Sequence, residues 1–66
     1  MTFRYTPKYK FNCLLEYYTP GGYRRQSHHS TIATAADLAL EIAEKQLRAD
    51  KRRRVAWVSY GKAIQA

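Results

Sequence analysis

The chain has 66 residues, and its 12 Lys and Arg residues against five Asp and Glu residues give a formal net charge of +7 with neutral histidines. This length allows one domain and excludes a two-domain enzyme or a deep enclosed pocket, and the single cysteine excludes an internal disulfide and a multi-cysteine zinc site. No apolar run reaches the roughly 18 residues of a membrane span, and the basic start lacks the apolar stretch of a secretory signal. We therefore expect a soluble protein of the reducing cytoplasm.

A chain of this size has a marginal hydrophobic core unless something supplements it. This chain contains six Tyr, two Phe and one Trp, and each aromatic side chain buries roughly 150–250 Å² when it packs. Two possibilities follow: the domain folds alone on an aromatic core, or it depends on a partner or on a second copy of itself.

The first predicted element is a strand over residues 9–18, after an extended lead-in over residues 1–8. Apolar and polar side chains alternate in this segment, which is the pattern of a strand with one buried face. One face carries Tyr9, Phe11, Cys13, Leu15 and Tyr17. The other face carries Lys10, Asn12, Leu14, Glu16 and Tyr18.

A turn over residues 19–22 connects this strand to a second one, predicted over residues 23–32. The turn reads Thr19-Pro20-Gly21-Gly22, in which Pro20 presets φ and Gly21 can accept a positive φ, so a type II turn is expected. The second strand is polar, which is typical of an edge strand with one face in water.

A helix is predicted over residues 35–51, with the Thr34 hydroxyl as its N-terminal cap and Asp37 as the partner acid of a capping box. At 100° per residue, the apolar side chains share one arc and the charged ones the opposite arc. The apolar arc consists of Leu38, Ala39, Leu40, Ile42, Ala43 and Leu47. The charged arc consists of Asp37, Glu41, Glu44, Lys45, Arg48 and Lys51.

A last strand is predicted over residues 55–60, where Gly61 ends or bulges it, and residues 61–66 are predicted to be a tail. The element order is β-β-α-β, an α+β fold. Short connections place the last strand antiparallel to the first. We expect a three-stranded antiparallel sheet of order 2-1-3, with the amphipathic helix on one face.

The strongest candidate for a functional feature is the run Lys51-Arg52-Arg53-Arg54 at the predicted helix end. Its simplest explanation is that cations offset the negative end of the helix dipole. One or two cations would be enough for that, so four in a row favour contact with phosphates or with an acidic protein surface. Arg24 and Arg25, beside Tyr23 and the glycine turn, form a second candidate patch, for which a solubilising edge strand is the alternative explanation.

Other residues have structural explanations. His28 and His29 are neighbours in a strand and point to opposite faces, so they are poorly placed to chelate one ion, and no metal or cofactor is predicted. Cys13 is expected to be a small buried hydrophobe. No nucleophile, base and orienting group occur at a useful spacing, so we expect a protein that is not an enzyme.

The tyrosines offer a further possibility, because exposed aromatic rings can stack on bases. Tyr18 and Tyr23 are the ones expected to be exposed, whereas Tyr9 and Tyr17 share a face with the core residues. The sheet face without the helix is therefore a candidate docking surface for nucleic acid or protein.

The order of elements, together with Ala39-Leu40-Glu41, Ala43-Glu44 and Gln46 in the helix, resembles small phage proteins that shut down host machinery. The resemblance to the phage inhibitors of bacterial RNA polymerase covers residues 9–60 in outline, but those are acidic and this chain is basic, so no functional residue is carried over. Some anti-CRISPR proteins have a similar size and plan, and some of them are basic. The resemblance implies a phage-encoded protein that acts in the host cytoplasm.

These observations lead to three hypotheses. The first is a non-enzymatic inhibitor that docks on a host nucleic-acid-handling complex, a CRISPR effector or RNA polymerase, through electrostatic and steric competition. The second is a regulatory module that binds DNA or RNA directly. The third is an assembly protein that forms a homodimer through its exposed strand edge.

Overall fold

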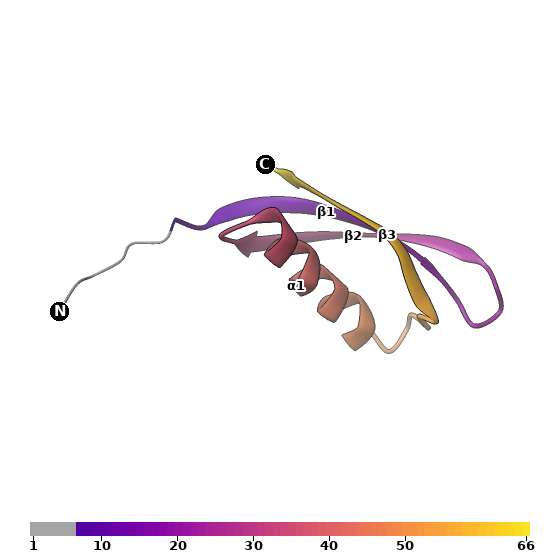
Figure 1. The fold of residues 1–66 in the computed structure, drawn as a ribbon. Helices are drawn as coiled ribbons and strands as arrows, with labels where there is room; N and C mark the ends of the chain where they lie inside the picture. Colours follow the sequence, from indigo (N-terminus) through magenta and orange to yellow (C-terminus); the bar gives the residue numbers. More distant parts are fainter. Residues whose placement is uncertain (1–6) are drawn as a thin grey trace.

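The computed structural model describes residues 7–66 and contains three strands and one helix in the predicted order. The strands are β1 (Tyr9–Tyr18), β2 (Arg24–Ala33) and β3 (Trp57–Gln65), and the helix is α1 (Ala36–Ala49). They form one antiparallel sheet of order β2-β1-β3, with α1 packed against one face (Figure 1). The predicted α+β fold and strand order are therefore confirmed. Most of the expected lead-in, residues 1–6, lies outside the described residues.

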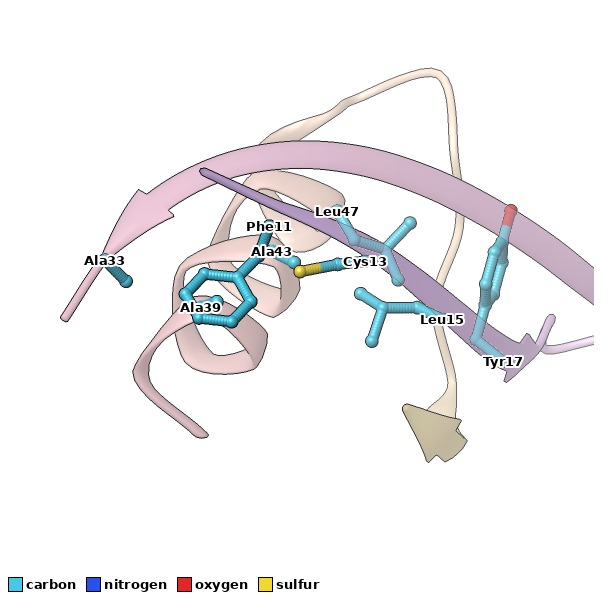
Figure 2. Close-up of a cluster of buried hydrophobic side chains, with 8 residues drawn as sticks. All are labelled: Phe11, Cys13, Leu15, Tyr17, Ala33, Ala39, Ala43 and Leu47. Atoms are coloured by element: carbon cyan, nitrogen blue, oxygen red, sulfur yellow. The ribbon is translucent and has the colours of Figure 1, made fainter. Parts of the chain in front are cut away.

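The core lies between β1 and α1, as the alternation in β1 predicted. Four side chains of β1 are buried, and three helix residues with no exposed surface cover them (Figure 2). Two of the three are alanines, Ala39 and Ala43, whose small side chains let the helix axis approach the sheet closely. The buried hydrophobic residues are Phe11, Cys13, Leu15, Tyr17, Ala33, Ala39, Ala43 and Leu47.

The hairpin turn differs from the prediction. The Gly22 N–H donates to the Thr19 carbonyl at 2.9 Å, and the Thr19 N–H donates to the Tyr23 carbonyl at 2.9 Å. The positive φ, 86°, is at Gly22 and not at Gly21. A type II turn is therefore wrong. The bonding pattern is that of a three-residue loop in which a type I turn precedes a left-handed glycine.

The start of α1 also differs from the prediction. Its N-cap is Ala35, which has no side chain that could cap the helix, so the expected Thr34 cap is not formed. The Asp37 carboxylate instead accepts the Leu38 N–H at 3.0 Å. Leu38, which the helical arc placed in the core, is 43% exposed because it lies at the edge of the buried stripe.

The end of the chain is a longer strand than predicted. β3 starts two residues later than expected, at Trp57, and continues past Gly61 to Gln65, so the predicted tail is wrong. A Cβ atom at Gly61 would lie 3.1 Å from a Leu15 methyl carbon and 3.2 Å from a Leu40 methyl carbon. Gly61 therefore makes room for the core and does not end the strand.

Candidate functional site

The basic run lies in the connection between α1 and β3, after the helix has ended. The helix ends at Ala49, and the Asp50 carboxylate accepts the Arg52 N–H at 3.0 Å. The same carboxylate lies 3.5 Å from Nε of Arg53, and the Asp50 carbonyl accepts the Arg53 N–H at 3.1 Å. The predicted helix over residues 35–51 is therefore too long at this end, and Lys51 lies outside it. Arg48 is the basic residue of the last helical turn, so neutralising the helix dipole does not explain the run.

Arg53 differs from its three neighbours because it also reaches the sheet. Its Nη1 donates to the Gln26 carbonyl of β2 at 3.4 Å. Together with the Asp50 contacts, this bond holds the connection against the β2 edge. Lys51, Arg52 and Arg54 are exposed, and their side chains are available to a partner.

The fold brings the two predicted patches to one end of the molecule. The Ala56 N–H, just after the run, donates to the Tyr18 carbonyl at 2.8 Å, and Tyr18 pairs directly with Arg24 across the hairpin. The connection after α1 and the hairpin turn accordingly lie toward the same end of the sheet (Figure 1). We call this cluster the basic end; it consists of Arg24, Arg25, Lys51, Arg52, Arg53 and Arg54.

Tyr23 adds an aromatic ring to the basic end. It is 67% exposed, and the guanidinium carbon of Arg25 lies 5.9 Å from its ring centroid. This distance allows a cation–π contact, which at an exposed site contributes about 0.5–1 kcal/mol. The exposure predicted for Tyr23 is confirmed.

The sheet face without α1, which we call the open face, carries the predicted β1 residues together with side chains from both edge strands. Tyr18 stacks on Trp57 of β3, with the ring centroids 4.7 Å apart and the planes 15° from parallel. Trp57 remains 54% exposed and Tyr60 49% exposed. A depression in this face is lined by Asn12, Cys13, Leu14, His28, His29, Ser30, Lys62 and Ile64.

A β-bulge puts Trp57 and Tyr60 on the same face. Tyr60 pairs with Glu16 and Val58 with Tyr17, which leaves Ser59 as the extra residue. The Ser59 hydroxyl donates to the Glu16 carbonyl at 3.2 Å and so gives this backbone oxygen a hydrogen-bond partner at the bulge. Without the bulge, the alternation of a regular strand would place Trp57 and Tyr60 on opposite faces, because they are three residues apart. Sequence reasoning missed this pair because nothing in the local sequence signals the bulge.

The two histidines diverge as predicted. His28 is exposed on the open face, and His29 is half-buried beside the helix, where Nε2 lies within hydrogen-bond distance of the Ser27 hydroxyl. Burial lowers the pKa of His29 below its usual value, and Arg53 and His28 lower it further, while Gln46 and Asp50 act in the opposite direction. The half-buried ring is thus favoured in its neutral form.

Cys13 is buried, as predicted, and its Sγ lies 3.5 Å from the Thr31 hydroxyl. Within residues 7–66, no three His, Cys, Asp or Glu side chains gather where they could hold a metal ion. Across the same residues, 7–66, α1 is the only helix, and its 14 residues are too few to cross a membrane.

Comparison with known proteins gives no relative. No protein-family model, no curated protein and no solved structure matches this chain. The resemblance to phage proteins stays a prediction.

Proposed function

We propose that this chain is a non-enzymatic nucleic-acid-binding protein that holds a phosphate backbone with its basic end. The observation that supports the proposal is the convergence of two basic clusters, distant in sequence, at one end of the sheet through the contacts of Arg53 and Ala56. Asp50 pairs with Arg53 there, and Lys51, Arg52 and Arg54 remain exposed. Cations gathered in this way release counterions when they bind phosphates, which makes affinity strongly salt-dependent.

The test is a binding titration at two salt concentrations. Fluorescently labelled 20-nucleotide single strands and duplexes would be titrated at about 50 and 200 mM NaCl and followed by anisotropy. Contact with about six phosphates predicts a loss of roughly 10³-fold in affinity over this range. Absent binding at 50 mM, despite the charge of +7, would refute the proposal.

A matched pair of triple variants assigns the contacts. Replacing Lys51, Arg52 and Arg54 with Ala leaves the Arg53 contacts intact and should reduce the slope of log affinity against log salt by about two to three. The control replaces three other exposed cations, Lys8, Lys45 and Arg48, and removes the same amount of charge. If both variants lose affinity equally, net charge and not the basic end controls binding.

A second candidate function is the inhibitor that docks on a host nucleic-acid-handling complex. Ile32 and Ile64, 65% and 54% exposed, share the open face with Leu14 and favour this function, because apolar side chains grouped on one face are typical of protein contact sites. The protein would be added to run-off transcription by purified bacterial RNA polymerase and to target cleavage by a purified CRISPR effector. Inhibition without any binding to free nucleic acid would favour this function over the first.

A further inference from the structure

The open face carries aromatic side chains that the core does not use. Trp57 and Tyr60 lie on the opposite face of the sheet from the buried cluster and are each about half exposed. Single exposed aromatic side chains are common on protein surfaces and need no explanation. Here, however, the bulge at Ser59 places Trp57 and Tyr60 of β3 on the same face. A third ring, that of Tyr18, stacks on Trp57 and holds it in place.

Trp57 is oriented as a platform. Tyr18 covers one face of the indole in a nearly parallel stack, yet Trp57 remains 54% exposed. The other face of the indole is therefore open to a planar partner, and its orientation is fixed before that partner arrives. Because the ring is already ordered, little side-chain entropy remains to be lost on binding.

Cations flank this platform on both sides. Arg24 lies directly opposite Tyr18 in the β1–β2 register, and Lys62 follows Tyr60 by two residues on the open face. The basic end is only three residues before Trp57 in the chain, at Arg54. The acid on this face, Glu16, accepts a hydrogen bond from Gln26 Nε2 at 3.0 Å and would repel a phosphate from the middle of the sheet.

We infer that the open face is a base-stacking platform for single-stranded nucleic acid, with Trp57 and Tyr60 as the stacking residues and the basic end as the phosphate contact. This inference rests on the proposed function and names the substrate class of the same protein. Bases in a duplex are already stacked on each other, so only an unpaired strand can place a base on Trp57. Stacking on an aromatic side chain accepts any base, so we expect little sequence preference.

The chain's single tryptophan makes the test direct, because Trp57 is the only source of indole fluorescence. At about 50 mM NaCl, the protein would be titrated with a thymidine 12-mer, a uridine 12-mer, an abasic 12-mer with the same phosphates, and a 12-base-pair duplex. We expect the base-carrying single strands to quench Trp57 fluorescence by half or more. The abasic strand should bind more weakly and leave the fluorescence unchanged. Quenching with either base-carrying strand supports the inference, and the tighter of the two identifies DNA or RNA.

Variants separate stacking from charge. Trp57→Ala and Tyr60→Ala should each weaken binding of a labelled base-carrying strand by roughly 5- to 150-fold and leave binding of the abasic strand unchanged. The control is Tyr9→Ala, which removes a 40% exposed tyrosine from the opposite face of the sheet and should change neither affinity. Far-ultraviolet circular dichroism would establish that each variant is folded.

The possible failures are distinguishable. Equal affinity for abasic and base-carrying strands, without quenching, overturns the platform and leaves the proposed function in place. Tighter binding of the duplex than of the single strands also overturns the platform. Absent binding of every strand overturns the proposed function and the platform together. A shift of Trp57 emission with protein concentration alone would mean that a second copy covers the open face, and the inference would be wrong.

Discussion

Gly22 has a backbone conformation that other residues rarely adopt, with φ at 86°. A side chain there is strained even though a Cβ atom would meet nothing within 4 Å. We expect Gly22→Ala to lower the free energy of unfolding by about 1 kcal/mol, measured by urea denaturation.

Gly21→Ala is the matched control for this prediction. Gly21 does not have a positive φ. Its Cβ would lie 3.3 Å from the ring of Tyr23, which is exposed and can move, and 3.9 Å from the Thr19 hydroxyl oxygen, an ordinary contact distance. The control should change stability by no more than about 0.5 kcal/mol. Equal losses in the two variants would contradict the turn geometry. Two adjacent glycines in the sequence could not show which one takes the positive φ, because that depends on the number of residues in the loop.

At the scale of elements, we expect the part of the chain after Gly61 to stabilise the sheet as the second half of β3. Lys62 to Gln65 pair with β1, and the Ala66 N–H donates to the Lys10 carbonyl at 2.9 Å. Ending the chain after Gly61 removes several backbone hydrogen bonds and the packing of Ala63 on the core, so we expect a loss on the order of 2–4 kcal/mol. Thermal unfolding followed by circular dichroism measures it.

The control for the truncation keeps the backbone and removes exposed side chains. Lys62→Ala with Ile64→Ala preserves the β1 pairing and should cost no more than about 1 kcal/mol. A truncated chain that melts at the wild-type temperature would mean that the last five residues do not stabilise the sheet.

The helix and the first two strands could be predicted from the sequence because their patterns are local. The period of two in β1 and the apolar arc of α1 both point to the core that is observed. The length of β3 could not be predicted, because the bulge at Ser59 interrupts the alternation and Gly61 resembles a strand end. Glycine is required at position 61 because a Cβ atom there would crowd the side chains of Leu15 and Leu40, which are distant in the sequence.

The same division applies to the candidate site. The run of cations and Arg24 with Arg25 were visible in the sequence, but their meeting at one end depends on the strand pairing and on the contacts of Ala56 and Arg53. The pairing of Trp57 with Tyr18 was not visible, because it requires the strand order and the register together. Residue types could be read from the sequence, whereas the surface they form depends on the fold.

At the scale of the whole molecule, the concentration of positive charge at one end costs stability. The basic end holds six of the 12 Lys and Arg residues, and like charges in a compact protein repel one another. Salt screens this repulsion over about 10 Å at 0.1 M. We therefore expect the melting temperature to rise by roughly 4–8 °C between about 20 and 300 mM NaCl, equivalent to about 1 kcal/mol, while nucleic-acid affinity falls over the same range.

The triple variants used for binding also test this repulsion. The variant without Lys51, Arg52 and Arg54 should melt at a higher temperature than the wild type at 20 mM NaCl and gain less from added salt. The control without Lys8, Lys45 and Arg48 has the same net charge, but its changes are spread over the surface. They also remove the exposed Glu44–Arg48 ion pair at 3.2 Å, so the melting temperature of the control should rise little above that of the wild type. A melting temperature that falls as salt is added to the wild type would mean that attraction between opposite charges dominates. The prediction that repulsion at the basic end destabilises the fold would then be wrong.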